Sequence, residues 1–348
     1  MELQADNAKR SRRAITTSEI ARLCGVSRTT VSAVLNGKSA VRESTRRKVL
    51  ECIRRQNYQF GMIARTLVDE LSRMVAILVS ALGSPYPMMV FRGLSEVLDA
   101  EGYHILFHNV RPEDQEAPET LASIHAYRPA GYIVLKGAEG LDSEHVRKIQ
   151  ELGIPVVCET HLEGIEVHTL KVDSRQGMRL GTDHVVEKGH RRVGHLAGPT
   201  FSVGAKERKL GFIESLIAHD IPVSEAQIVD AGETPTAGYH AALEILREPA
   251  RRPTALVCFN DMLAMGVYRA AHELSLNIPE DLSVVGYDGI DFTELFGPPL
   301  TTVDTFPVLR GRRLAELLLR VIRNQTGRRI VEEWVSPRLI DRASVRRM

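Results

Sequence analysis

Short apolar runs alternate with amphipathic segments over most of the chain, from Arg73 onward. Met74–Val79 is a continuous apolar run, and the segment around Met88–Ala100 places its apolar residues at helical spacing. Continuous runs of roughly four to eight apolar residues are typical of strands buried on both faces, and the amphipathic segments between them are typical of covering helices. The pattern predicts parallel sheets with helices on both faces.

The alternation continues in two series of expected strands. The first also includes Tyr103–Phe107, Gly131–Leu135 and Pro155–Val157, with helices near Glu119–Tyr127 and Ser143–Leu152. The second begins at Thr169–Val172 and continues through Val193–Leu196, Ile228–Asp230, Ala255–Cys258 and Leu282–Tyr287, with helices between. Near Thr301–Phe306 the chain is expected to return to the first half, with a long helix at Arg310–Arg323 and a late strand at Glu333–Val335.

The N-terminal pattern is different and predicts three short helices. Thr16 to Glu19 fits a capping box that opens the first helix, and Gly25 stands where a tight turn needs positive φ. Ser27 is a good cap for a second helix to about Leu35, and a third helix is expected from about Glu43 to Gln56. The expected buried residues are Ile20, Leu23 and Cys24 in the first helix, Val31, Val34 and Leu35 in the second, and Val49, Leu50 and Ile53 in the third.

Three such helices with a small-residue turn form the scaffold that lays its second helix in the DNA major groove. A generic helical bundle has the same spacing, so spacing alone leaves both interpretations open. Charge favours DNA: residues 1–60 hold thirteen Lys/Arg and five Asp/Glu, a net of +8, which leaves −7 for the rest of a chain whose total is +1. A basic end on an acidic body is the layout expected when one end meets a polyanion.

Composition and motifs exclude several other classes of protein. No apolar run approaches the roughly 18 residues that span a bilayer, and the polar, basic start of the chain lacks the apolar stretch of a signal peptide, so we expect a cytoplasmic protein without a membrane partner. The cysteines lie far apart and are expected to be buried hydrophobes. Because no catalytic, phosphate-loop or dinucleotide motif occurs, we expect no enzyme activity, no cofactor and no metal.

The run TTSEIARLCGVSRTTVSAVLNGKSAVRESTRRKVLECIRRQNY resembles the N-terminal domain of the LacI/GalR family of bacterial repressors, most specifically from Gly25 to Gly37. The resemblance continues through residues 172–199, NDMLAMG (260–266), LSVVGYD (282–288) and PPLTTV (298–303). It implies an N-terminal all-α helix-turn-helix domain and an α/β periplasmic-binding-protein-like sensor domain of two doubly wound lobes. The expected domains are a basic tail (1–14), the helix-turn-helix domain (15–59), a hinge (60–72) and the sensor domain (73–348), with lobe 1 at about 73–172 and 305–332 and lobe 2 at about 173–304 and 333–348.

By position, the resemblance assigns base reading to Arg28, Thr29 and Ala33. Arginine can bind a guanine edge with two hydrogen bonds, and the methyl groups of Thr and Ala suit a thymine methyl. Because Ala33 donates no hydrogen bond, specificity there is expected to rest on apolar contact or shape. The residues expected at phosphates are Thr16, Ser27, Thr30, Ser32, Asn36 and Lys38.

Residues 60–71 resemble the family hinge, which folds into a short helix on its operator. Ala64, Arg65 and Leu67 match its pattern, with Leu67 as the wedge that enters the minor groove. The segment is too short to be a stable helix alone, so ordering on DNA is physically reasonable. The alternative interpretation is that Leu67 is simply a buried helix residue.

In two-lobed domains of this kind the ligand lies between the lobes, at the carboxyl ends of the strands. The resemblance places Arg208 and Asp288 there, and a planar guanidinium suits ligand hydroxyls or a carboxylate. The other candidates for effector binding are Tyr86, His161, Glu233, Asn260 and Asp261. Two alternatives stay open, Arg208 as a salt-bridged helix residue and Asp261 as a helix cap. Glu233 stands where several relatives carry a stacking aromatic, which argues against a flat ring stacked there. Because paired Arg and Asp groups read hydroxyls well, a sugar, sugar acid or polyol is favoured over a nucleobase.

We therefore expect a sequence-specific transcriptional regulator, a repressor by default, that binds a roughly palindromic double-stranded DNA operator as a homodimer, with a tetramer left open. A small-molecule effector bound between the lobes would control it. Two alternatives remain: the same regulator controlled by a protein partner, and a solute-binding protein of transport.

Overall fold

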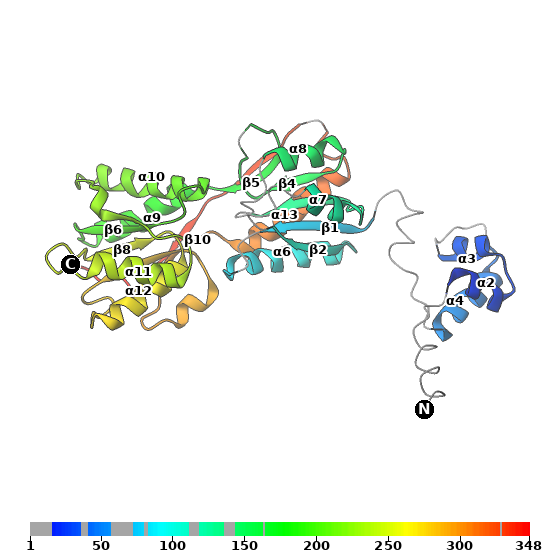
Figure 1. The fold of residues 1–348 in the computed structure, drawn as a ribbon, viewed down its shortest axis with the longest axis horizontal. Helices are drawn as coiled ribbons and strands as arrows, with labels where there is room; N and C mark the ends of the chain where they lie inside the picture. The colour runs from blue at the N-terminus through cyan, green and yellow to red at the C-terminus, as the bar shows by residue number, and fades with distance from the viewer. Residues whose placement is uncertain are drawn as a thin grey trace, which may run out of the picture. The chain divides into compact units, whose positions relative to one another are not determined.

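The computed structural model describes residues 16–35, 41–56, 72–79, 83–110, 118–135, 143–162, 164–327 and 329–348. The chain divides into an N-terminal unit, which runs to Ser72 and takes in residues 126–128, and a larger unit of residues 73–125 and 129–348 (Figure 1). Within these residues no helix combines the length and the apolar character that crossing a membrane requires.

Three helices stand in the described part of the N-terminal unit: α2 (Thr17–Cys24), α3 (Arg28–Leu35) and α4 (Glu43–Arg55). The predicted capping box is present, because Thr16 Oγ1 accepts from the Glu19 N–H at 3.3 Å and the Thr16 N–H donates to Glu19 Oε2 at 2.7 Å. Gly25 ends α2 in the left-handed conformation, with φ 62°. The Ser27 hydroxyl then begins α3 by accepting from the Thr30 N–H at 3.1 Å.

The core of this unit confirms most of the predicted positions and corrects two of them. Leu23 is 51% exposed and Leu50 is 38% exposed. On α4 the core contacts come from Val49, Cys52 and Ile53, and the next residue along a helix is rotated by about 100°, which turns Leu50 away. On α2 the small Ala21 faces the other helices in place of Leu23. The buried core residues are Ile20, Ala21, Cys24, Val31, Val34 and Val49. The side chain of Leu35 lies outside the described residues.

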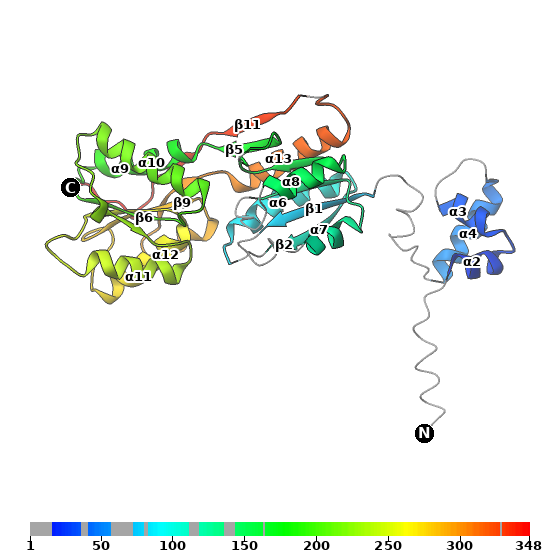
Figure 2. The same ribbon diagram turned by 45° about the horizontal axis from the view of Figure 1, so that its top comes forward.

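The larger unit is built from two sheets, each with helices on both faces (Figures 1 and 2). In the first lobe the described strands follow the order β11-β5-β4-β3-β1-β2, and all neighbours run parallel. The strands are β1 (Met74–Val79), β2 (His104–Asn109), β3 (Gly131–Val134), β4 (Val156–Cys158), β5 (His168–Val172) and β11 (Glu332–Val335).

In the second lobe the described strands follow the order β12-β10-β9-β8-β6-β7, with β12 antiparallel to β10 and the other pairs parallel. The strands are β6 (Val193–Ala197), β7 (Ile228–Asp230), β8 (Ala255–Cys258), β9 (Ser283–Asp288), β10 (Thr301–Asp304) and β12 (Arg338–Ile340).

Helices cover both faces of each sheet because successive residues of a buried strand point to opposite sides. In β1, Ile77 packs with residues of α6 and α13, whereas Leu78 packs with residues of α7 and α8. The first lobe holds α6 (Tyr86–Ala100), α7 (Pro118–His125), α8 (Ser143–Glu151) and α13 (Pro307–Ile322). The second holds α9 (Ser174–Glu187), α10 (Val203–Ala218), α11 (Pro235–Leu246) and α12 (Asp261–Glu273), with short 3-10 helices η2 (Glu225–Gln227) and η3 (Asp291–Leu295).

Helices α6 and α13 lie unusually close together, because a glycine of each faces the backbone of the other. A Cβ atom on Gly93 would lie 1.9 Å from the Val308 carbonyl oxygen, and one on Gly311 would lie 2.0 Å from the Val90 carbonyl oxygen. No larger residue fits at either position without separating the helices. This contact sets the spacing between α6 and α13, and α13 carries Arg310, which is part of the site described below.

Three segments of the described chain connect the two lobes. They lie at Asp173 between β5 and α9, at residues 305–306 between β10 and α13, and at residues 336–337 between β11 and β12. The prediction for the C-terminal segment was wrong: residues 333–335 were expected in lobe 2, but β11 pairs in parallel with β5, where Trp334 faces Lys171 in register. Likewise β5 closes the first series of strands and does not begin the second.

Candidate DNA-reading helix and ligand pocket

Helix α3 directs one face into the core of the N-terminal unit and the opposite face outward. Val31 and Val34 are buried, whereas Arg28 and Thr29 are exposed at the start of the helix. Ala33, the third predicted base-reading residue, is partly exposed. The predicted base-reading positions are thus outside the core, as a helix that enters a groove requires.

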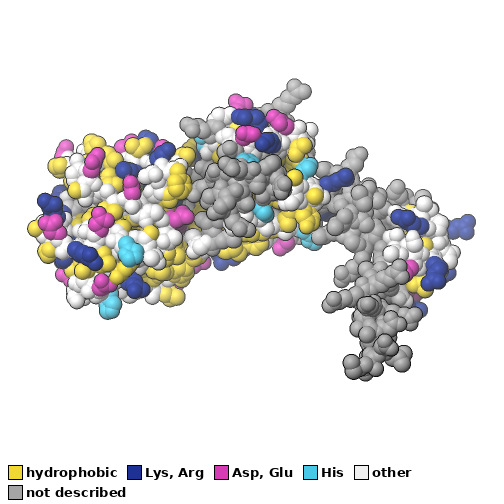
Figure 3. Space-filling view, in the orientation of Figure 1, with side chains coloured by type: hydrophobic (Ala, Val, Ile, Leu, Met, Phe, Trp, Pro, Cys, Tyr) yellow, Lys and Arg dark blue, Asp and Glu magenta, His cyan; other side chains and the backbone are white. Residues whose placement is uncertain are grey.

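Hydroxyl groups gather at the beginning of α3. The Ser27 Oγ lies 2.6 Å from Thr29 Oγ1 and 2.8 Å from Thr30 Oγ1, and Ser27 is exposed. Thr16 is exposed at the corresponding end of α2, and Ser32 is partly exposed on α3. Helix N-termini present N–H donors to anions, so these positions suit phosphate contacts. Figure 3 shows Lys and Arg side chains on the visible face of this unit. The predicted residues Asn36, Lys38, Ala64, Arg65 and Leu67 lie outside the described residues.

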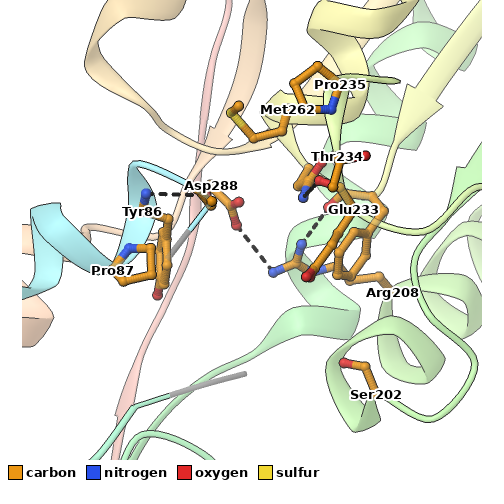
Figure 4. A pocket seen from close by; sticks show the side chains of 13 residues that line it. Tyr86, Pro87, Ser202, Arg208, Glu233, Thr234, Pro235, Met262 and Asp288 are labelled. Carbon is orange, nitrogen blue, oxygen red and sulfur yellow. Dashed lines mark hydrogen bonds and ion pairs between the residues drawn. The ribbon is translucent and has the colours of Figure 1, made fainter. Parts of the chain in front are cut away.

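A pocket of about 110 Å³ lies between the two lobes of the larger unit (Figure 4). The second lobe contributes the segments that follow β6, β7 and β8, and the last residue of β9. The first lobe contributes the segment that follows β1. Parallel strands place their carboxyl ends at one edge of a sheet, which explains the convergence. The lining residues include five of the predicted effector-binding residues, Tyr86, Arg208, Glu233, Asn260 and Asp288.

Arg208 is the central cation of this pocket. It is 2% exposed and its guanidinium lies between two rings, 3.6 Å from the centroid of Tyr287 and 4.4 Å from that of Phe259. Nη2 is 3.3 Å from Asp288 Oδ1, and Nη1 donates to the Phe259 carbonyl oxygen. The stacking and the two bonds hold the planar group in one orientation. Both interpretations of the sequence therefore apply, since Arg208 is salt-bridged and also lines the pocket.

Asp288 ends β9 in a strained backbone conformation. Its φ is +117°, a region that residues with side chains rarely adopt. Its carbonyl oxygen accepts from the Thr305 hydroxyl at 3.2 Å. Such strain persists only where surrounding contacts hold it and is typical of functional sites. Here it turns the carboxylate toward Arg208 (Figure 4).

The structure separates the roles of Asn260 and Asp261. Asn260 is the cap of α12, because its Oδ1 accepts from the Leu263 N–H at 2.8 Å, and its Nδ2 donates to the Glu233 carbonyl oxygen at 3.1 Å. Asp261 does not line the pocket: it is buried beneath it, where Oδ1 accepts from the Thr302 hydroxyl at 2.6 Å and Oδ2 from the Ile290 N–H at 2.8 Å. The cap of α12 is therefore Asn260 and not Asp261, and Asp261 is not among the residues that line the pocket.

Burial makes Asp261 an unusual acid. Burial, and then the nearby charge of Asp288, raise its pKa to about 8, although the bonds from Thr302 and Ile290 oppose this shift. Its carboxyl is therefore largely protonated at neutral pH. Asp261 therefore adds little negative charge beside the pocket at that pH.

A second buried arginine, which the sequence pattern did not indicate, lies in the first lobe. Arg310 is 1% exposed, its Nη2 is 2.8 Å from Glu159 Oε1, and its Nη1 donates to the Tyr86 hydroxyl. The Tyr86 hydroxyl donates to the same Glu159 oxygen at 2.8 Å, and burial raises the pKa of Tyr86. In the sequence, Arg310 stands in LRGRR, which looks like the basic surface of a helix. Phe259 and Tyr287 were missed because each is an apolar residue of a buried strand region.

His161 is not part of the pocket. It is exposed and lines a second cavity of about 440 Å³, together with Glu159, Lys171, Arg310 and Trp334. We call this cavity the Arg310 chamber. The hydrogen bond between Tyr86 and Glu159 joins a wall residue of the pocket to a wall residue of the chamber.

Comparison with known proteins follows the same division of the chain. Residues 16–59 match the profile of bacterial regulatory proteins of the lacI family, and residues 182–345 match that of the periplasmic binding protein-like domain. The transcriptional repressor PurR of Mannheimia succiniciproducens is 28% identical over 333 residues, which cover 96% of this chain and 99% of the relative. PurR of Actinobacillus pleuropneumoniae is 29% identical over 342 residues, with 96% and 99% covered.

Solved structures match over nearly the whole chain. The lac repressor dimer bound to operator and the anti-inducer ONPF matches with a TM-score of 0.82 and 26% identity, covering 96% of this chain and 100% of the other. The complex of the transcriptional regulator CelR with cellobiose matches with a TM-score of 0.71 and 26% identity, covering 95% and 99%.

Proposed function

The chain belongs to the lacI family of bacterial regulatory proteins, and from that premise we propose that it binds a roughly palindromic operator as a homodimer, under the control of a hydroxylated small molecule. Members of the family are DNA-binding transcriptional repressors with an effector-binding domain, and they are not enzymes. What remains to be assigned is which residues of this chain read the operator and what its effector is.

On DNA, we assign base reading to Arg28, Thr29 and Ala33. Their place outside the core of the N-terminal unit supports this assignment. Phosphate contacts are assigned to Thr16, Ser27, Thr30, Ser32, Asn36 and Lys38, and Ala64, Arg65 and Leu67 to the minor groove at the hinge. A lac repressor dimer bound to operator supports a dimer in which each N-terminal unit reads one half-site.

In the pocket between the lobes, we propose that the effector is a sugar, sugar acid or polyol. The observation that carries this proposal is the pair formed by Arg208 and Asp288: a guanidinium fixed between two rings beside a carboxylate turned toward it. A hydroxyl group both donates and accepts, so neighbouring ligand hydroxyls can satisfy a fixed donor and a fixed acceptor together. CelR in complex with cellobiose is a related protein with a sugar ligand.

Closure of the two lobes on the ligand would change the relative orientation of the first lobes in a dimer, and with it the spacing of the DNA-binding units. The effector controls DNA binding only if it binds one of these arrangements better than the other. Repression is the default outcome of operator binding.

Thermal shift and operator binding test the proposal together. Full-length protein is titrated with neutral sugars, sugar acids and polyols, while its binding to duplexes selected from a randomised library is followed at fixed salt. We expect at least one class to raise the Tm and to change the affinity for the selected operator. If no small molecule does either, but a protein from the same cells changes operator binding, control by a protein partner replaces this proposal.

A further inference from the structure

The paired charges of the pocket, Arg208 and Asp288, stand on different elements of the second lobe (Figure 4). Arg208 belongs to α10, whereas Asp288 is the last residue of β9. A ligand can bond to both side chains only while their spacing and orientation are kept, because a hydrogen bond weakens steeply with distance and angle. A residue that fixes this arrangement therefore contributes to ligand binding without contacting the ligand.

The segment that joins β8 to α12 supports both members of this pair. The Phe259 carbonyl oxygen accepts from Arg208 Nη1, and the centroid of the Phe259 ring lies 4.4 Å from the same guanidinium. Two residues later, Asp261 Oδ2 accepts from the Ile290 N–H at 2.8 Å. One short segment thus holds Arg208 directly and also holds the turn that follows Asp288.

The turn after β9 is strained and needs contacts that hold it. Asp288 has φ +117°, and Gly289, the next residue, has φ +76°. Glycine adopts positive φ readily, but an aspartate does so only where its surroundings fix the backbone. Thr305 contributes one such contact, to the carbonyl of Asp288, and Asp261 contributes another, to the N–H of Ile290. The carboxyl of Asp261 is thus the contact that reaches the far end of the turn.

The Asp261 carboxyl is itself fixed in place. Asp261 is 1% exposed, and its Oδ1 accepts from the Thr302 hydroxyl at 2.6 Å. A Cβ atom on Gly286, in β9, would lie 2.1 Å from the same oxygen, so a larger residue at this position would displace the carboxyl. Asp261 therefore joins three elements beneath the pocket: α12, strand β10 and the turn after β9.

From these contacts we infer that Asp261 is a positioning residue of the effector site: it holds the turn that carries Asp288, so that the Asp288 carboxylate faces Arg208, and it does not contact the effector itself. This inference rests on the proposed function, since it adds a residue to the same interlobe site. The role requires an acceptor for the Ile290 N–H and a partner for the Thr302 hydroxyl. An asparagine amide, which has nearly the shape of a carboxyl, provides both, and an alanine provides neither.

Hydrogen exchange tests the hold on the turn without a ligand. In the full-length wild type we expect the Ile290 amide to exchange slowly, because it donates to a buried acceptor. Exchange should be equally slow in Asp261→Asn and at least about tenfold faster in Asp261→Ala. Mass spectrometry of peptides that contain residue 290 measures these rates. A wild-type rate in Asp261→Ala would overturn the inference.

Ligand titration tests the consequence for binding. Full-length protein is titrated by calorimetry with D-galactose, D-glucitol, D-gluconate and cellobiose, and the compound that binds wild type most tightly is used for the variants. Asp261→Ala should weaken its binding at least about fivefold, because buried donors lose their acceptor, and Asp261→Asn should stay within about twofold of wild type. The control is Thr182→Val, since Thr182 is also fully buried and donates to the Met178 carbonyl at 2.9 Å but does not line the pocket. Its affinity should equal that of wild type.

A second background shows whether Asp261 acts through Asp288. In Asp288→Gly no carboxylate remains to be positioned, and glycine adopts the positive φ of this residue without strain. In that background Asp261→Ala should change the affinity for the same compound by less than about twofold, since two residues that act as one unit are not additive. Where Asp288→Gly binds too weakly to measure, the contrast between Asp261→Ala and Asp261→Asn decides.

The outcomes of these titrations have separate meanings. Equal affinity in wild type and Asp261→Ala, an equal loss in Asp261→Asn and Asp261→Ala, or an equal loss in both backgrounds overturns the inference and leaves the proposed function standing. If Asp261→Ala does not fold, Thr302→Val takes its place, with an expected loss of at least about twofold from the removal of one bond to the carboxyl. If no sugar, sugar acid or polyol binds the wild type, the proposed function fails and the inference fails with it.

Discussion

The hydroxyl of Thr305 donates to the backbone carbonyl of Asp288 across 3.2 Å. Asp288 faces the pocket, and Thr305 lies in the segment that carries the chain from the second lobe back to the first. The next residue, Phe306, has φ +54°. The centroid of its ring lies 4.9 Å from the guanidinium of Arg338, the first residue of β12, which follows the connection at residues 336–337. A ligand bound by Asp288 would thus contact a residue that is hydrogen-bonded to Thr305, in one of the connections between the lobes.

We predict that Thr305→Val weakens effector binding by about 2- to 10-fold, the range expected for one net hydrogen bond of about 0.5–1.5 kcal/mol. Valine keeps the shape of threonine but lacks the hydroxyl, so only the backbone N–H of residue 305, 3.5 Å away, still donates to the Asp288 carbonyl oxygen. Fluorescence or calorimetric titration measures the affinity, and Thr254→Val, which alters a similar hydroxyl far from the pocket, is the control. Equal affinities in wild type and Thr305→Val would show that this bond does not position Asp288.

A second prediction concerns the pair formed by Arg208 and Asp288. Arg208→Met alone is expected to cost about 3–5 kcal/mol of stability, because it leaves a buried carboxylate without its partner. The double variant Arg208→Met/Asp288→Asn removes both charges and should recover most of that loss while effector binding falls by at least about tenfold. Chemical denaturation and ligand titration measure the two effects. A double variant that still binds effector normally would remove Arg208 and Asp288 from the ligand site.

On DNA, we predict different effects for two basic residues. Arg28→Ala should relax the preference for one base pair by about 1–3 kcal/mol, because it removes a contact to a base edge. Lys38→Ala should weaken binding to all sequences about equally and lower the salt dependence, because it removes a phosphate contact. Selection from a randomised operator library distinguishes the two. An unchanged base preference in the Arg28 variant would contradict its assignment.

A fourth prediction follows from the raised pKa of Asp261, which is about 8 in the folded chain against an ordinary value of 3.8. Between these values the unfolded chain loses the proton and the folded chain keeps it, so the contribution of Asp261 to stability falls as pH rises, by up to about 1.4 kcal/mol per pH unit. In Asp261→Asn this contribution is absent, since an amide can bond to Ile290 and Thr302 without titrating. The difference in unfolding free energy between wild type and Asp261→Asn, measured from pH 5 to pH 9, should therefore decline and then level off above about pH 8. If the difference in unfolding free energy does not vary with pH, the raised pKa of Asp261 is contradicted.

Local signals were sufficient to predict much of the fold. The capping box at Thr16, the turn at Gly25 and the cap at Ser27 each depend on neighbours within a few residues, and all three are present. The alternation of strands and helices gave the α/β class of the larger unit. The lobe predicted for β11 was wrong, because the sequence of an exposed, charged strand such as Glu332–Val335 does not indicate which sheet the strand joins.

Part of the pocket was predictable from the positions of strand ends in the sequence. Asp288, Asn260 and Glu233 lie at or just after the ends of strands, and strand order brings such ends together. Arg310 was not predictable from local pattern, because its burial depends on the glycine contact between α6 and α13 and on the distant partner Glu159. His161 follows a strand as well, yet it faces a different cavity, since the Tyr86–Glu159 contact separates the two.

The central claim is that occupancy of the interlobe site controls operator binding, and one titration tests it most directly. The affinity of the full-length protein for its selected operator is measured at fixed salt against increasing concentrations of a compound that raises its Tm, in wild type and in Arg208→Met/Asp288→Asn. We predict that the operator affinity of the wild type changes by at least about tenfold, within the usual range of coupling between two sites, while that of the double variant stays constant. An operator affinity that stays the same in wild type although the compound is bound would contradict the account.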